Sequence, residues 1–183
     1  MKKIVIICLS LMIGSTWAAA QTYMTKTAQV SFLSKGGVEA IQAKNSSAVS
    51  TLNTETGEIQ FAILMKAFIF DKALMQEHFN ENYVESHKYP KATFKGVITN
   101  LKEVNFAKDG SYPAKVTGTM NMHGVQKTAN ATGYIYVKGG KINATSDFNI
   151  LLSDYKISVP KAVQQNISNM VNIHVEANLD SSK

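Results

Sequence analysis

Apolar and polar residues alternate along most of the chain. Within each alternating segment the apolar residues occupy every second position, which is typical of a strand with one buried face. The segments are 28–33, 46–52, 58–68, 92–101, 114–122, 126–138, 141–152 and 171–179. Because they follow one another at short and even spacing, they predict an all-β sandwich or up-and-down barrel of eight or nine antiparallel strands rather than βαβ units.

Short turn motifs separate several of these segments. Gly139-Gly140 lies between two alternating segments and predicts a two-residue hairpin turn. His123-Gly124 predicts a second such turn, because histidine is among the residues enriched at positive φ. Tyr-Pro occurs at 89–90 and at 112–113, and we expect both prolines to start a strand, where the ladder does not yet need their missing N–H.

Two segments break the alternation. In residues 71–85, apolar side chains such as Leu74 and Phe79 recur at helical spacing. Residues 160–169 begin with Pro160, and proline is favoured at the first position of a helix. We therefore expect one or two short helices that flank the strands.

Residues 1–20 have the composition of an export signal. Lys2 and Lys3 precede an apolar run over residues 4–13, and Ala18-Ala19-Ala20 forms a small-residue cleavage site. The apolar run is too short to span a bilayer, so export and removal is the better interpretation. We expect a periplasmic or secreted protein.

The remaining residues, 21–183, are long enough for a single domain with its own core. They lack a thiol because the one cysteine, Cys8, lies inside the predicted signal. All nineteen basic residues are lysines, and they are scattered singly along the chain. Without the bidentate fork of arginine, phosphate recognition is weak, and we expect no nucleic-acid partner.

The segment 76–94, QEHFNENYVESHKYPKATF, raises the question of a metal or acid/base site. His78 and His87 are nine residues apart, which is no zinc-ligand spacing, although Glu81 or Glu85 could share a helix face with His78. We interpret the segment instead as a helix-to-strand junction whose glutamates form a solvated edge.

Other candidate chemistry is sparse. His123 could act as a base or ligand at the mouth of a barrel, but we prefer the interpretation that it occupies a turn position. His174 falls on the polar phase of the last strand, so we expect it outside. The sequence contains no GxSxG motif and no GxGxxG loop. We therefore expect no catalytic residues, no metal and no cofactor.

The apolar positions of the strands form a large inward face rich in rings and methyl groups. An eight-stranded barrel is just wide enough either to be filled by side chains or to hold one small ligand. The pattern alone leaves both alternatives open.

Three stretches carry a resemblance to a known family: QEHFNENYVESHKYPKATFKG, YPAKVTGTMNMHGVQK and FNILLSDYKISVP. Their order and spacing resemble the YceI-like family over residues 22–180. The resemblance implies an extended antiparallel eight-stranded barrel, lipocalin-like in shape, with a helix beside it. It also implies export to the bacterial periplasm and, as in some members, binding of a polyisoprenoid or similar lipid.

Together these observations favour a periplasmic lipid-binding protein that sequesters or transports a polyisoprenoid, a quinone or a fatty-acid-like molecule. The residues expected to bind it are Phe32, Phe61, Ile63, Phe68, Phe70, Leu74, Phe79, Phe94, Val116, Met120, Phe148 and Ile150. Two alternatives stay open: an enzyme acting on such a lipid through His123 or through His78 and Glu81, and a filled barrel that only binds other proteins. Transient membrane contact and a homodimer also stay open.

Overall fold

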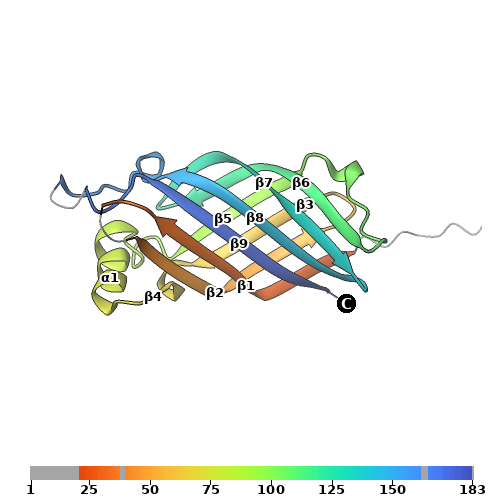
Figure 1. Cartoon of the computed structure of the whole chain (residues 1–183), viewed down its shortest axis with the longest axis horizontal. Helices are drawn as coiled ribbons and strands as arrows, with labels where there is room; N and C mark the ends of the chain where they lie inside the picture. The colour runs from red at the N-terminus through yellow and green to blue at the C-terminus, as the bar shows by residue number, and fades with distance from the viewer. Residues whose placement is uncertain (1–20, 38–39, 162–164, 183) are drawn as a thin grey trace, which may run out of the picture.

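A closed barrel of eight antiparallel strands forms the body of the protein (Figure 1). The structure is a computed structural model and describes residues 21–37, 40–161 and 165–182; the predicted export signal lies outside these residues. The barrel strands are β1 (Thr22–Ser34), β2 (Ile41–Asn53), β3 (Glu58–Leu64), β5 (Lys91–Ile98), β6 (Gly110–Met122), β7 (Val125–Lys138), β8 (Lys141–Leu151) and β9 (Met170–Ser181). A two-residue strand, β4 (Ile69–Phe70), pairs with β2.

The barrel closes through β1, which pairs with β2 on one side and with β9 on the other. Around the rest of the wall, successive barrel strands are hydrogen-bonded neighbours. This order is the up-and-down barrel that the alternation predicted, and it confirms the predicted fold class. Closure removes the unpaired edges that an open sheet would expose.

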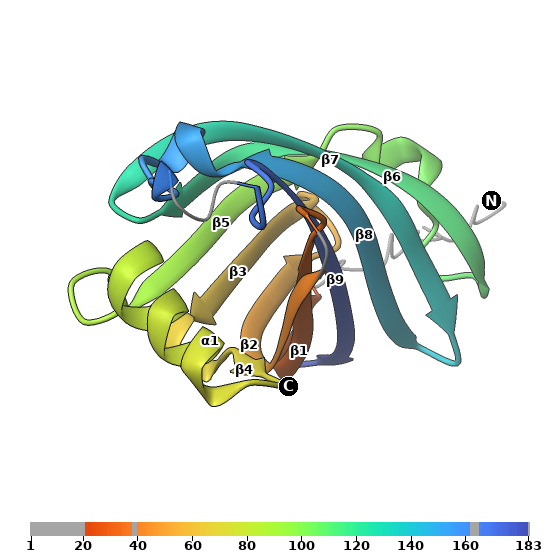
Figure 2. The same ribbon diagram turned by 60° about the vertical axis from the view of Figure 1, so that its left-hand side comes forward.

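The two ends of the barrel differ, as Figure 2 shows. One end, called the mouth here, carries residues 35–37 after β1, residues 65–90, the turn at 123–124, and residues 152–161 and 165–169. The opposite end, the base, carries the other three connections. Both Gln21 and Ser182 also lie at the base, where the Ser182 N–H donates to the Thr22 carbonyl at 2.8 Å.

The predicted helix over 71–85 is present at the mouth in a shorter form. It consists of α1 (Ala73–His78) followed by a π-helical turn (Phe79–Tyr83), in which the Val84 N–H donates to the Phe79 carbonyl. The second predicted helix, 160–169, includes three residues outside the described part, and residues 165–169 form turns and bends. In the described ranges, no helix is long and apolar enough to cross a membrane.

The predicted turns are confirmed by the backbone. His123 and Gly124 have φ values of +51° and +72°, and Gly139 and Gly140 have φ values of +56° and +76°. Positive φ at all four positions is what a two-residue hairpin turn of type I′ requires, because its twist matches that of the two strands.

The two prolines behave differently. Pro90 directly precedes β5, as predicted. The prediction for Pro113 is wrong, because Pro113 lies inside β6. The reason is that β5 ends at Ile98, opposite Val116, so this part of β6 has only β7 beside it. On the side of β6 that β5 no longer covers, the Asn100 side chain donates a hydrogen bond to the Pro113 carbonyl at 3.0 Å.

The interior near the base is filled with bulky side chains. Leu52, Ile142 and Leu179 point inward from three strands and are at most 1% exposed. Val104, which follows the short 3₁₀ turn Leu101–Glu103, is also buried there. This packed half gives the barrel the close-packed interior of an ordinary globular core.

Candidate ligand-binding site

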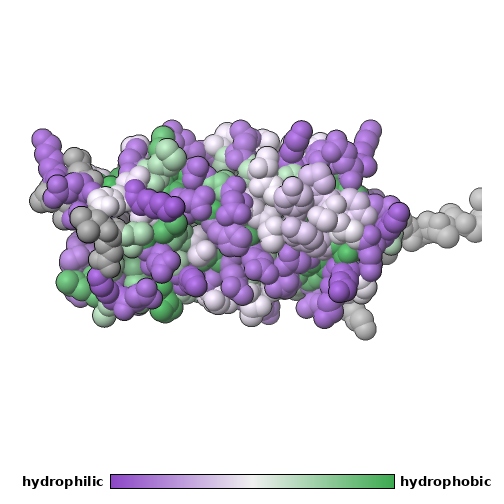
Figure 3. Space-filling model, viewed as in Figure 1, coloured by the Kyte–Doolittle hydropathy of each residue, from purple (hydrophilic) through white to green (hydrophobic). Residues whose placement is uncertain are grey.

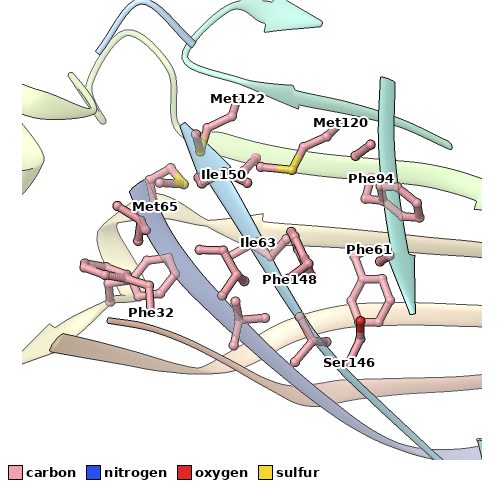
Figure 4. A pocket seen from close by; sticks show the side chains of 18 of the residues that line it. Phe32, Phe61, Ile63, Met65, Phe94, Met120, Met122, Ser146, Phe148 and Ile150 are labelled. Carbon is pink, nitrogen blue, oxygen red and sulfur yellow. The ribbon is translucent and has the colours of Figure 1, made fainter. Parts of the chain in front are cut away.

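The interior near the mouth is a cavity of about 390 Å³. Figure 4 shows side chains from β1, β3, β5, β6 and β8 pointing into one shared space. Phe61, Ile63 and Phe94 point inward yet are only half-buried, because they face this space instead of one another. The volume lies in the range of sites that hold small organic ligands.

Small residues on three strands make room for the cavity. Ala129, Ala131 and Gly133 occupy successive inward positions of β7 and line it. On the next two strands, Gly118 of β6 and Gly96 of β5 are directly opposite each other. A Cβ atom at either glycine would lie 2.6 Å from Cζ of Phe94, so the ring of Phe94 can lie flat against the wall only because both residues are glycines.

Four phenylalanine rings border the cavity at the mouth. Phe32 comes from β1, Phe68 and Phe70 from the chain around β4, and Phe79 from the π-helical turn. Their ring centroids are 5.1–5.8 Å apart in five contacts, within the range of favourable aromatic pairs. The Phe70 N–H donates to Oε1 of Gln76 at 3.2 Å, which ties β4 to α1.

Eleven of the twelve residues predicted to bind a ligand line the cavity. The exception is Leu74, whose position was predicted wrongly: it is 61% exposed. The helix is short, and it turns Met75 and Phe79 toward the barrel, which leaves Leu74 facing solvent. Ligand binding by the other eleven residues stays a prediction.

The sequence analysis missed several lining residues. Met65 lies at an inward position of the alternating segment 58–68 and Met75 lies in the predicted helical segment 71–85, but neither was among the residues predicted to bind a ligand. Ala129, Ala131 and Gly133 were inside a predicted strand, but their small size was the available signal. Small residues at inward positions indicate space rather than packing.

The cavity lining is almost entirely apolar. Among the described lining residues there is no lysine, aspartate or glutamate. His78 and Tyr83 lie at its mouth edge, and burial raises the pKa of the Tyr83 phenol, so Tyr83 is neutral at physiological pH. The cavity is therefore suited to uncharged, apolar matter, because a buried charge without a partner is costly.

His123 joins three connections next to the mouth. Its Nδ1 lies 2.9 Å from the Tyr155 carbonyl oxygen, and its Nε2 lies 2.9 Å from Oε2 of Glu85. Both partners present acceptor oxygens, so each ring nitrogen of His123 faces a hydrogen-bond acceptor. The edge of its ring packs against Tyr89, with centroids 4.6 Å apart.

Glu85 was predicted to be part of a solvated edge. In the structure it also binds His123. The hydrogen bond from His123, and to a lesser degree the charge of Lys88, hold the pKa of the Glu85 carboxyl below its usual value. Glu85, His123 and Lys156 are also the non-glycine residues with positive φ in the described ranges, and all three lie in these connections. The contacts of His123 with Glu85 and Tyr155 hold these loops in backbone conformations that non-glycine residues do not favour on their own.

The histidines form no reactive cluster. His78 and His87 are exposed, and His174 lies on the outside as predicted, where it contacts Asp147 at 2.9 Å. Both ring nitrogens of His123 are engaged, which leaves neither nitrogen free for a substrate. Over the described residues no group of three histidine, aspartate or glutamate side chains could hold a metal.

Apolar residues are also exposed around the mouth. Figure 3 shows green, apolar surface mainly toward the left-hand end, which carries α1, β4 and the start of β9. The exposed residues at this end, called the rim here, are Leu64, Ile69, Leu74, Leu151 and Met170. Single exposed apolar residues are ordinary, but five around one opening form a feature.

Comparison with known proteins identifies relatives of the chain. The model of the YceI-like domain matches residues 16–179. A direct comparison with curated proteins finds no significant match.

Solved structures share the fold at low sequence identity. A polyisoprenoid-binding domain from Saccharophagus degradans implicated in plant cell wall breakdown has a TM-score of 0.76 and 15% identity, over 89% of this chain and 99% of that one. BcnA from Burkholderia cenocepacia has a TM-score of 0.68 and 17% identity, over 84% and 96% of the two chains. A YceI protein from Campylobacter jejuni has a TM-score of 0.54 and 21% identity, over 75% and 81%.

Proposed function

The chain belongs to the YceI-like domain family, and on that basis we propose that it is a carrier that holds one long apolar lipid in the mouth half of its barrel. The ligand class is a polyisoprenoid, a quinone or a fatty-acid-like chain. The observation that carries the proposal is the apolar cavity, whose described lining contains no lysine, aspartate or glutamate. The similar domain from Saccharophagus degradans, described as polyisoprenoid-binding, supports this ligand class.

Binding, rather than catalysis, fits the chemistry of the mouth. An enzyme would need a base or nucleophile that reaches the cavity. His123 does not line the cavity, and its two ring nitrogens are occupied by Glu85 and Tyr155. His78 lines the mouth edge, but the described lining offers it no carboxylate or lysine as a partner.

The proposed location is the periplasm or the exterior of the cell. The support is the export-signal composition of residues 1–20, followed by a chain without a thiol. In protein produced with its own signal, we expect the intact mass to correspond to a chain that begins near Gln21. A mass that retains residues 1–20 would contradict this location.

The affinity should lie in a measurable range. At about 0.3 kcal/mol per heavy atom, a ligand of about twenty heavy atoms gains about 6 kcal/mol, and one of about forty gains about 12 kcal/mol. These free energies correspond to dissociation constants from tens of micromolar to nanomolar. No polar contact is needed to reach them.

The test is native mass spectrometry of protein purified from its compartment without detergent, followed by solvent extraction. We expect a discrete additional mass and an extractable lipid. If no lipid is retained, the purified protein is incubated with a polyisoprenoid, a quinone or a fatty alcohol. A bare mass throughout would contradict the proposal.

Two variants of β6 control for specificity. Val116→Phe places a ring in the cavity, because Val116 points inward and is half-buried. Thr119→Phe places the same ring on the exposed outer face of the same strand. We expect Val116→Phe to reduce lipid occupancy about tenfold and Thr119→Phe to leave it unchanged, while equal losses would indicate an effect on folding only.

We further propose that the rim contacts a lipid bilayer while the ligand transfers. The apolar rim surrounds the opening, and Lys44 is paired with Ile69 there, which suits a surface of anionic lipids. Ile69→Glu should weaken flotation with anionic vesicles, whereas Val97→Glu, an exposed site near the base, should not. Equal flotation of both variants would contradict a role for the rim.

A further inference from the structure

The wall of the barrel has an interruption between β7 and β8. Pairing of these strands runs from the base only as far as Thr132 and Asp147. Beyond this pair β7 continues toward the mouth through residues 125–131, and β8 continues through residues 148–151, without further ladder pairing between them. We call this interruption the window.

The window is bounded at the mouth as well. The short 3₁₀ turn Leu152–Tyr155 follows β8 and crosses toward the β6–β7 turn. Two contacts hold it there: Lys127 Nζ lies 3.4 Å from Oδ1 of Asp154, and His123 binds the Tyr155 carbonyl. The interruption is therefore an opening with fixed ends rather than a frayed edge.

The direction of the backbone groups in the window follows from the ladders on the other side of β7. Lys115 of β6 directs its backbone toward β5, because its N–H donates to Asn100 Oδ1 and its carbonyl accepts from the Thr99 N–H. On β7, Thr132 lies opposite Lys115. The two residues therefore form a non-hydrogen-bonded pair, and the N–H and carbonyl of Thr132 face β8.

Alternation extends this assignment along β7. The pairing of β6 with β7 has no register shift, so every second residue keeps the same direction. The N–H and carbonyl groups of Gln126, Thr128 and Asn130 therefore face the window. Those of Ala129 and Ala131 face β6 and complete its ladder.

Both edges of the window also border the cavity. Ala129 and Ala131 on β7 and Phe148 and Ile150 on β8 line it. The backbone donors and acceptors of β7 thus lie at the wall of an otherwise apolar chamber. Such groups are costly to leave unpaired when water is excluded, as it is when the chamber is occupied.

We propose that the window is the binding site for the polar end of the lipid, and that this end is an uncharged group that both donates and accepts hydrogen bonds, such as a hydroxyl or a primary amide. The inference rests on the proposed lipid binding and specifies its ligand class. Backbone N–H and carbonyl groups alternate along the edge of a strand, so they match a group that does both. A carboxylate is a poor match, because no lysine lines the described cavity and Lys127, at the mouth end of the window, is already paired with Asp154.

The first test uses a proline that removes one donor of the window. In Thr128→Pro the lost N–H is one that faces the window, so the ladder with β6 keeps its hydrogen bonds. Thr128→Ala is the matched control, because it removes the same exposed side chain and retains the N–H. The probes are oleyl alcohol, oleamide, oleate and the corresponding hydrocarbon octadecene.

We expect wild-type protein and Thr128→Ala to bind oleyl alcohol and oleamide about fivefold more tightly than octadecene, the equivalent of one net hydrogen bond. In Thr128→Pro the ratio of the octadecene dissociation constant to that of oleyl alcohol or oleamide should fall from about five toward one, while binding of octadecene is unchanged. A preference that persists in Thr128→Pro, or a preference for oleate in wild-type protein, would overturn the window site. Failure of every probe to bind would instead refute the lipid-binding function itself.

The second test needs no substitution. Amide hydrogen exchange of the free protein should be fast at Gln126, Thr128 and Asn130 and slow at Ala129 and Ala131. Oleamide should slow exchange at the first three residues, and octadecene should have a smaller effect there. Uniform protection along residues 126–131 in the free protein would show that the window is closed and would overturn the proposal.

Discussion

The two halves of the barrel are built from the same strands but differ in what fills them. On β8, Ile142 and Ile150 point to the same interior from opposite ends of the strand. Ile142 is 1% exposed among packed neighbours, whereas Ile150 is only half-buried because it faces the cavity. The comparison shows that alternation decides which side chains point inward, while the size of those side chains decides whether the interior is solid or hollow.

The boundary between the halves is itself apolar. Ile59, Ile98, Ile135 and Ala144 lie where the cavity ends, and all four are buried. The packed half therefore supplies the floor of the cavity as well as stability. We expect the two halves to respond differently to the same substitution.

The largest difference should appear on removal of an isoleucine side chain. Ile142→Ala should lower the free energy of unfolding by about 2–5 kcal/mol, because it leaves a void among packed neighbours. Ile150→Ala should lower it by about 1 kcal/mol or less, because Ile150 has fewer contacts to lose. Urea unfolding of both variants measures this, and equal losses would mean that the mouth half is as tightly packed as the base.

Ligand binding should act on the hollow half. At a free probe concentration about a hundredfold above the dissociation constant, oleyl alcohol should raise the free energy of unfolding by about 2.7 kcal/mol. Thermal unfolding measures the total effect, and amide exchange shows where it acts. Added protection confined to the base would contradict a ligand in the mouth half.

Enlarging an alanine should have opposite consequences in the two halves. Ala177→Leu, at a fully buried position near the base, should cost about 1–3 kcal/mol through overpacking. Ala131→Leu should cost less or even stabilise the protein, since its side chain enters the cavity, but it should weaken binding of oleyl alcohol. The comparison fails if Ala131→Leu destabilises the protein as much as Ala177→Leu does.

The smallest effect should come from the loop junction at the mouth. The folded pKa of Glu85 lies below its ordinary value of 4.5, so its ionised form stabilises the folded protein. This contribution is complete above about pH 4.5 and is lost as the pH falls through the lowered pKa. Glu85→Gln should therefore lower the thermal unfolding midpoint near neutral pH and have a diminishing effect in acid.

A matched control exists on the outer wall. Glu58 forms an exposed ion pair with Lys95, with 3.3 Å between Oε1 and Nζ. Surface pairs of this kind contribute little, so Glu58→Gln should leave the midpoint almost unchanged. An equal response of both variants would indicate a general charge effect and not the contact with His123.

Much of the fold could be predicted because its determinants are local. Alternation identified the barrel strands, and two-residue motifs identified the turns at His123 and Gly139. Leu74 was misplaced because helical spacing alone does not say which side of a short helix meets the barrel. Pro113 was misplaced because its tolerance depends on where the neighbouring strand β5 ends.

The features that shape the candidate site depend on contacts distant in sequence. The contact between Glu85 and His123 joins residues 38 positions apart, and nothing in either local segment indicates it. The window arises because β7 and β8 stop pairing before either strand ends. Small or apolar residues still occupy the inward positions at Ala129 and Ala131 on β7 and at Phe148 and Ile150 on β8, so these positions give no sign of the interruption.

The start of β1 and the end of β9 lie side by side at the base, where Tyr23 is paired with Ser181. A tag, a surface linker or a second protein attached directly before β1 or directly after β9 would therefore leave the mouth and its rim unobstructed. Two such barrels joined end to end would meet at their solid halves and open in opposite directions. Attachment at these two points would immobilise the barrel with its chamber accessible from the solution.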